Sequence, residues 1–300
     1  MTSLGLWVAR QVVRLGRDPK LASSVLKKIY NRRAYPAPAQ PTWRARRALD
    51  IHRGEHQGHL TFELHLKGHA RSTRRLLYLH GGGFVRPLHW AHWDACTSLA
   101  RATGAQVTLP TYPLCPEHSL DECHEHLLSL YTTLAQRSDV EELIIAGDSA
   151  GGNLALCLAL QALQVEGAQL RRLILFCPWV DLGMSNPEVD DYAARDPMLT
   201  RSTLEEWGRW WSGARALSDP LVSPLYADLR GLPPTDIFLG EDDMLTPDGL
   251  ALAQAMERAG VEVQQDVTPR AFHDFMAVTF TPEAKAVYRS IKERVSPLGR

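Results

Sequence analysis

Residues 143–152 read LIIAGDSAGG, and this stretch decides the fold. Four apolar residues are followed by the pattern Gly-x-Ser-x-Gly and then by leucines at helical spacing, at 154 and 158. A buried strand that turns sharply into a helix is the context of a nucleophile elbow, which exposes its central serine at the end of a sheet. We expect Gly147 and Gly151 to flank this turn because neighbouring backbone comes too close for a Cβ atom. Ser149 is therefore the candidate nucleophile, although so short a pattern also occurs by chance in surface turns.

The chain around this stretch alternates between strand-like and helix-like patterns. Short apolar runs typical of buried central strands lie at 76–79, 107–109, 143–146, 173–176 and 237–239. Residues 60–66 alternate between apolar and polar side chains, as a half-exposed strand near a sheet edge does, and residues 261–263 are also strand-like. Because helical segments separate most of these runs, the sequence predicts an α/β fold with a mostly parallel sheet covered by helices on both faces.

Two intervals lack strand-like runs and fit a helical cap. Residues 1–45 carry apolar side chains at helical spacing until Pro36, Pro38 and Pro41 end the pattern. The second interval, 181–224, has helical spacing at Leu204, Trp207, Trp210 and Trp211. Such tryptophans more often serve ordinary packing, and the alternative hypothesis is that they also form the wall of a substrate pocket.

Residues 80–84, HGGGF, directly follow the strand expected at 76–79. Ligands of α/β proteins bind at this end of the strands. Consecutive glycines let backbone N–H groups approach a developing negative charge without intervening side chains, as an oxyanion hole requires. We expect a further donor from Ala150, which starts the helix after Ser149. A flexible turn or a phosphate loop is the alternative, but residues 84–86 lack the Gly-Lys-Ser/Thr end of a phosphate loop.

A serine nucleophile needs a base, and the base needs a carboxylate that orients it. His273 follows the last expected strand, and the chain order serine, acid, histidine is the order that this kind of fold uses. A lone histidine between phenylalanines is otherwise more often structural. The acid should follow the strand at 237–239, where the candidates are Glu241, Asp242, Asp243 and Asp248. The residues alone do not rank Asp242 against Asp243.

Composition argues against several classes of protein. The 300 residues include 33 basic and 34 acidic side chains, a net charge of -1, which favours neither nucleic acid nor an anionic membrane. Five cysteines without a CxxC pair argue against a disulfide framework or zinc cluster and predict buried, reduced thiols in a cytoplasmic protein. No apolar run approaches the roughly 18 residues of a membrane span, and the chain start lacks the pattern of a secretion signal. The histidines within 89–94 and 123–126 fit a metal site poorly, so we expect no metal.

Together the motifs resemble the hormone-sensitive-lipase-like family of α/β-hydrolases, particularly its bacterial esterase branch with GDSAG around the serine. The resemblance covers about residues 75–280. The motifs that carry it are HGGGF at 80–84, LCPEH at 114–118, GDSAGGN at 147–153, DPLVSP at 219–224, GEDDML at 240–245 and AFHDF at 271–275. The sequence departs from the family pattern at 111–115, TYPLC, and at Met244, positions that bear on local support of the site and on substrate range.

The resemblance implies an α/β-hydrolase core over residues 46–180 and 225–300, with a helical cap built from 1–45 and 181–224. The family pattern of glycine, two variable residues and aspartate falls on Gly240 and Asp243, so the resemblance favours Asp243 as the acid. It also implies that Gly82 and Gly83 are oxyanion donors together with Ala150.

The activity implied is that of a serine carboxylesterase that hydrolyses short-acyl esters through an acyl-enzyme intermediate, without a cofactor. The expected partner is a small-molecule ester, with no nucleic acid and no stable membrane insertion, and the sequence leaves a homodimer open. A lactone hydrolase or natural-product deacetylase would use the same triad. Two competing hypotheses come from different functional classes. One is a non-catalytic small-molecule receptor, as in the plant gibberellin receptors that resemble this family, and the second is a membrane-associated lipase.

Overall fold

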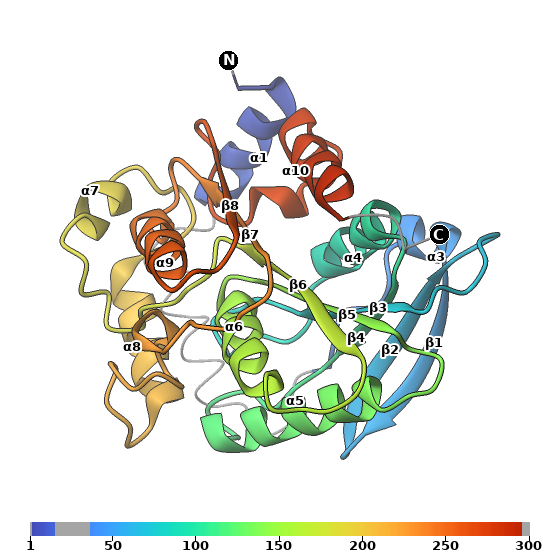
Figure 1. Ribbon diagram of the computed structural model, residues 1–300. Coiled ribbons are helices and arrows are strands. Elements are labelled where there is room, and N and C mark those ends of the chain that lie inside the picture. Colours follow the sequence, from blue (N-terminus) through green and yellow to red (C-terminus); the bar gives the residue numbers. More distant parts are fainter. Residues whose placement is uncertain (1, 16–36, 296–300) are drawn as a thin grey trace.

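A computed structural model describes residues 2–15 and 37–295, and its centre is an eight-stranded sheet (Figure 1). The strands lie in the order β1-β2-β4-β3-β5-β6-β7-β8. Their bounds are β1 Leu49–His56, β2 His59–Leu66, β3 Arg74–Leu79, β4 Gln106–Pro110, β5 Glu142–Asp148, β6 Gln169–Phe176, β7 Thr235–Gly240 and β8 Val263–Thr268. The β1–β2 and β2–β4 pairs are antiparallel and the other five are parallel, which confirms a mostly parallel sheet.

The apolar runs of the sequence correspond to the inner strands, and the half-exposed strand lies near an edge of the sheet, as expected. β3 to β7 contain the five predicted runs. Residues 60–66 lie in β2, which is second from the edge because β1 forms the edge. β1 has mostly exposed side chains and therefore carries no apolar alternation that would reveal it. At the opposite edge, β8 begins at Val263 rather than at residue 261, since pairing with β7 starts there.

Helices cover both faces of the sheet (Figure 1). The longer ones are α1 Leu4–Leu15, α4 Trp90–Thr103, α5 Leu120–Ala135, α6 Ala150–Ala162, α8 Arg201–Ser212, α9 Thr246–Arg258 and α10 Pro282–Arg294. The shorter ones are α3 Trp43–Ala48, α7 Val189–Ala193 and the 3-10 turns η1 Pro224–Tyr226 and η2 Phe275–Ala277. Helices on both faces leave the carboxyl ends of the parallel strands as the edge where a site can form.

Side chains of the central strands alternate between two hydrophobic cores. In β5, Leu143 and Ile145 belong to the core that includes α5, α6 and α9, whereas Ile144 and Ala146 belong to the core with α4 and α10. This period of two is that of an extended strand. Both faces of β5 are therefore buried, and the strand holds Ser149, which follows it, in a fixed position.

The interval 181–224 contains α7 and α8 and no strand, and α8 lies against the glycine turn at 80–84. Trp211 stacks on Phe84 with ring centroids 4.2 Å apart and 7° between the ring planes. A Cβ atom built on Gly83 would lie 2.1 Å from the Trp207 ring. The expected packing role of these two tryptophans is confirmed, while the division into cap and core stays a prediction.

The N-terminal prediction is confirmed only in part. α1 is helical as expected, and residues 16–36 lie outside the described residues. Residues 37–42 are not helical, and a short helix that the sequence pattern did not predict, α3, begins after the last proline. The Thr42 hydroxyl caps it by accepting the N–H of Ala45 at 3.0 Å, which explains why a helix starts there.

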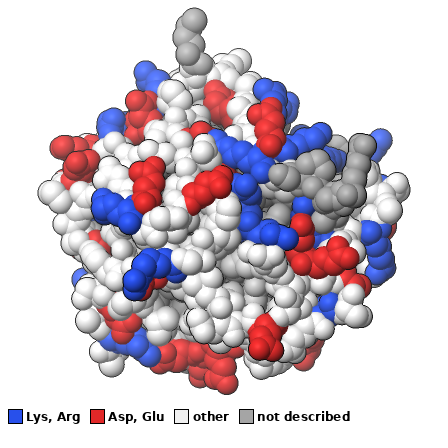
Figure 2. Space-filling view, in the orientation of Figure 1, with Lys and Arg blue, Asp and Glu red and all other residues white. Residues whose placement is uncertain are grey.

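The described surface agrees with the balanced charge of the sequence. Figure 2 shows acidic and basic side chains interspersed over one face of the molecule. All five cysteines are buried free thiols, as expected. Among residues 2–15 and 37–295, no helix combines the length and apolar character needed to cross a membrane.

Replacing Trp211 tests how strongly α8 is fixed to the glycine turn. The indole is buried and stacked, so Trp211→Ala is expected to lower the free energy of unfolding by about 3–5 kcal/mol. Trp43→Ala, at an exposed tryptophan of α3, should change it by no more than about 0.5 kcal/mol. Urea denaturation measures both, and similar losses in the two variants would contradict a tight α8 contact.

Candidate active site

Ser149 stands at the turn between β5 and α6 in a strained backbone conformation. Its φ is 54° and its ψ is -122°, a region that residues with a Cβ rarely adopt. The Ser149 N–H donates to the carbonyl of Phe176 at 2.9 Å, and the Ser149 carbonyl accepts the N–H of Trp179 at 3.0 Å. The end of β6 and the loop after it therefore hold the serine in this conformation.

The glycines around Ser149 are required by close backbone contacts, as the sequence predicted. A Cβ atom on Gly147 would lie 2.2 Å from the carbonyl oxygen of Gly151. A Cβ atom on Gly151 would lie 2.0 Å from the carbonyl oxygen of Leu79. Real Cβ atoms do not approach so closely, so β3, β5 and α6 meet at this point only because these residues lack side chains.

The turn at 80–84 is fastened to the elbow by Asp148. The Asp148 Oδ1 accepts the N–H of Gly81 at 2.9 Å and the hydroxyl of Tyr78 at 2.5 Å, and Oδ2 lies 3.4 Å from His92 Nε2. Burial opposes ionisation of the carboxyl, but His92 and Tyr78 outweigh it and hold the pKa of Asp148 below its usual value. A buried carboxylate thus links the glycine turn to the residue before Ser149.

The three expected oxyanion donors lie on this turn and at the start of α6. Gly82 and Gly83 have φ values of 124° and 63°, which favour glycine. Among the described residues, the N–H groups of Gly82, Gly83 and Ala150 donate to no protein acceptor. They are therefore able to donate to a bound anionic oxygen.

The structure brings His273 and Asp243 together. His273 Nδ1 lies 2.9 Å from Asp243 Oδ2, and both side chains are almost completely buried. The second oxygen of Asp243 accepts the N–H of Leu245 at 2.9 Å. Both oxygens of this carboxylate are hydrogen-bonded, which fixes the plane of the imidazole.

The remaining three candidate acids point elsewhere. Asp242 forms an ion pair with Arg10 of α1, and Glu241 accepts a backbone N–H from the loop after β8. Asp248 lies in α9, where burial raises its pKa to about 7. Of the four carboxylates, Asp243 is the one that contacts His273 in the described structure.

A second carboxylate, Asp274, occupies the opposite side of the imidazole. Asp274 Oδ2 lies 3.2 Å from His273 Nε2, and within the described residues no hydrogen bond joins that nitrogen to Ser149 Oγ. Burial lowers the pKa of His273, but Asp243 and Asp274 outweigh it and hold this pKa well above its usual value. Burial raises the pKa of Asp274 itself to about 7. The motif AFHDF contains Asp274, but its position beside the imidazole was not predictable from the residue pattern.

Cys177, which the sequence did not single out, completes the surroundings of the imidazole. Donor atoms of Cys177, Asp243 and His273 all lie within 4.8 Å of one another. Burial raises the pKa of the Cys177 thiol well above its usual value, so the sulfur stays protonated and is a poor metal ligand. This group is therefore better explained as the acid–histidine pair with a thiol beside it.

The histidines considered for metal binding belong to no group of three possible metal donors in the described structure. On α5, the His124 ring lies near Trp211, whereas the His126 ring lies 4.8 Å from that of His59. On α4, His92 pairs with Asp148. His92 Nδ1 also accepts the N–H of His89 at 2.9 Å, so the two histidines of this segment lie close together.

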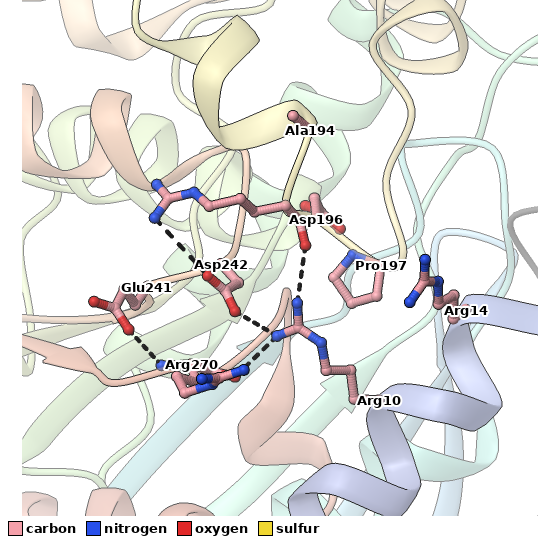
Figure 3. A pocket seen from close by; sticks show the side chains of 9 residues that line it. Arg10, Arg14, Ala194, Asp196, Pro197, Glu241, Asp242 and Arg270 are labelled. Atoms are coloured by element: carbon pink, nitrogen blue, oxygen red, sulfur yellow. Dashed lines mark hydrogen bonds and ion pairs between the residues drawn. The ribbon is translucent and has the colours of Figure 1, made fainter. Parts of the chain in front are cut away.

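Arg10 joins α1 to three loops around the site (Figure 3). Its guanidinium pairs with Asp242, donates to the carbonyl of Arg270 at 3.2 Å and donates to the carbonyl of Arg195 at 3.1 Å. These loops precede Asp243, precede His273 and connect α7 to α8. No sequence signal pointed to Arg10, because its partners are more than 180 residues away.

Asp196 supports the same region from the interval between α7 and α8. Its carboxylate accepts the N–H of Met244 at 2.9 Å, next to Asp243, and the N–H groups of Met198 and Leu199. Burial and the neighbouring Asp243 raise the pKa of Asp196 to about 6. Together with Arg10, this carboxylate fixes the acid-bearing loop from the side of the 181–224 interval.

A cavity of about 720 Å³ opens beside these groups. Gly81, Gly82, His273 and Asp274 form part of its wall. Apolar side chains from outside the sheet also contribute, including Val13 of α1 and Met198. A cavity of this size with an apolar wall and a few polar groups suits a small organic ligand.

Comparison with known proteins places the chain in a family. A family model described as the alpha/beta hydrolase fold matches residues 76–277. The chain belongs to the α/β-hydrolases. An esterase from Acinetobacter venetianus is 30% identical over 294 residues, which cover 96% of this chain and 94% of that protein. An ethyl acetate hydrolase from Pseudomonas putida is 34% identical over 69% of this chain and 67% of its own length.

A solved structure shows the same fold. The crystal structure of an esterase from the bacterial hormone-sensitive lipase family superposes with a TM-score of 0.83 over 98% of both chains, at 24% identity. This α/β-hydrolase resembles the hormone-sensitive-lipase branch and is a carboxylic ester hydrolase, as the sequence predicted.

Arg10→Ala tests whether the contact from α1 positions the acid-bearing loop. Loss of the ion pair should let residues 240–245 shift, and a displacement of about 1 Å lowers kcat/KM for a p-nitrophenyl ester by up to about 100-fold. Arg14→Ala, on the same helix, is the matched control and should keep wild-type activity. Equal kcat/KM in Arg10→Ala and wild type would show that this contact does not position the loop.

Proposed function

We propose that this hydrolase is a serine carboxylesterase in which Ser149 is the nucleophile, His273 the general base and Asp243 the orienting acid. The observation that carries the proposal is the buried contact of 2.9 Å between His273 and Asp243. This pair follows β7 and β8, while the strained Ser149 follows β5 at the same edge of the sheet. These are the three roles that acyl transfer requires.

The first step transfers the acyl group to Ser149. The hydroxyl attacks the ester carbonyl while His273 Nε2 takes its proton, and Asp243 stabilises the imidazolium that forms. The N–H groups of Gly82, Gly83 and Ala150 stabilise the negative oxygen of the tetrahedral intermediate. Nε2 lies beside Asp274, so this step requires the imidazole or the Ser149 side chain to move until Nε2 and the hydroxyl come within hydrogen-bond reach.

The second step releases the acid. The imidazolium first gives its proton to the leaving alcohol, and the imidazole then takes a proton from water as the water attacks the acyl-enzyme. The tetrahedral intermediate collapses, Ser149 regains its proton, and the carboxylic acid departs. The oxyanion donors serve this step in the same way as the first.

We further propose short-acyl esters as the substrates. The relatives include proteins named acetyl-hydrolase and ethyl acetate hydrolase, and the cavity beside His273 has about 720 Å³. A lactone or an acetylated natural product would undergo the same chemistry. The buried free thiols fit a reducing compartment, so we propose a cytoplasmic location.

Ser149→Ala tests the nucleophile. Removal of the hydroxyl should lower the rate of p-nitrophenyl acetate and butyrate cleavage by at least about 1,000-fold, because the oxyanion hole and binding alone give only residual catalysis. Ser218→Ala, the same change at an exposed serine, should leave the rate unchanged. Rates equal to wild type in Ser149→Ala would identify another nucleophile, and ligand saturation without turnover in wild type would support the receptor hypothesis.

Asp274→Asn tests the second carboxylate beside the imidazole. Its negative charge stabilises the imidazolium, so removing it should lower the pKa of His273 and extend activity to lower pH. The acid limb of the kcat/KM profile reports this pKa in the free enzyme and should therefore move toward lower pH. Asp228→Asn, at an exposed site, is the control, and an unchanged acid limb in Asp274→Asn would contradict the assigned role.

A further inference from the structure

Helix α1 presents an apolar face to solvent. We call Leu4, Trp7, Val8, Val12 and Leu15 the outer apolar face, and each of these side chains is between 47% and 79% exposed. They recur at the spacing of one side of a helix. On the opposite side, Leu6 is buried and Val13 is packed against the core. A helix at the surface ordinarily directs polar side chains outward, and α1 does not.

The outer apolar face is the largest concentration of exposed apolar side chains in the described structure. It contributes five of the twelve large apolar residues that are exposed there. The other seven include single side chains on separate elements, such as Trp43 of α3 and Val267 of β8. Scattered residues need no explanation, but a contiguous patch marks an interaction surface.

A hollow beside α1 has a small excess of basic side chains. In the described structure this hollow is lined by the four arginines Arg10, Arg14, Arg195 and Arg270 and by the three carboxylates Asp196, Glu241 and Asp242. Arg10 pairs with Asp242, whereas Arg14 is exposed on the flank of α1 and Arg270 is exposed across the hollow (Figure 3). Apolar side chains flanked by arginine are typical of helices that lie in the interface of an anionic membrane.

We propose that the outer apolar face of α1 docks on an anionic membrane surface, with the helix lying in the plane of the interface. Docking removes Trp7, Val8 and their neighbours from water, and lipid phosphates attract Arg14 and the arginines beside it. The helix is too short to cross a bilayer, so the contact is peripheral. Acidic lipid is the occupant that both the apolar side chains and the basic excess favour.

The position of α1 gives this docking a consequence for the site. Val13, on the inner side of the same helix, lines the cavity beside His273. Docking would therefore bring the cavity close to the lipid surface, where apolar esters concentrate. This consequence rests on the proposed function, whereas the docking itself does not.

Sedimentation of the full chain with lipid vesicles tests the proposal. Wild type should bind vesicles of phosphatidylcholine mixed with phosphatidylglycerol more tightly than phosphatidylcholine alone, and added salt should weaken this binding. The double variant Trp7→Gln/Val8→Gln should bind the mixed vesicles about tenfold more weakly, because two apolar side chains are lost from the interface. Glutamine favours helix at least as well as the residues it replaces.

Trp43→Gln is the matched control, since it removes an exposed tryptophan from a different helix. It should bind vesicles like wild type. Thermal unfolding and cleavage of p-nitrophenyl acetate without vesicles should be unchanged in all three proteins, which shows that any loss of binding is not misfolding. Absence of that cleavage activity in wild type would bear on the proposed function and not on docking.

Three results would overturn the proposal. They are absence of wild-type binding to the mixed vesicles, equal binding by the double variant, and an equal loss in Trp43→Gln. Light scattering gives a fourth. If wild type is a dimer that does not bind vesicles, and the double variant is a monomer, the face is an interface between copies of this chain.

Discussion

The buried hydrogen bond between Asp243 and His273 is the interaction on which the rest of the site depends. A carboxylate removed from water is costly unless its oxygens are paired, and here the imidazole and the N–H of Leu245 pair them. The sheet makes the contact possible, since β7 and β8 are parallel neighbours and the loops that follow them leave the same edge. The histidine that we propose as the base is therefore held by the two strands farthest from the antiparallel edge.

The strain at Ser149 is maintained by the same architecture. Its φ of 54° persists because hydrogen bonds from β6 and the following loop fix both its N–H and its carbonyl. Gly147 and Gly151 remove the Cβ atoms that would separate β3, β5 and α6. The proposed nucleophile and the proposed base thus both follow strands of one sheet, at its same edge.

The inner part of the fold could be predicted from sequence because burial on both faces leaves an uninterrupted apolar run. β3 to β7 have this property, whereas β1 is exposed and polar and β8 alternates weakly. The choice between Asp242 and Asp243 could not be made from the residues, because it depends on contacts of the folded chain. Asp243 contacts His273, whereas Asp242 pairs with Arg10, which lies 232 residues away. Contacts of Cys177 and Asp196 with this region likewise arise only from the folded chain.

The proposed mechanism requires Ser149 to form a covalent bond during turnover. Treatment with an organophosphate ester, followed by mass spectrometry of the intact protein and of its peptides, tests this requirement most directly. We predict a single adduct on the peptide that contains Ser149, with activity lost in proportion to labelling. Full activity without an adduct, or an adduct on a different residue that accompanies inactivation, would contradict the mechanism.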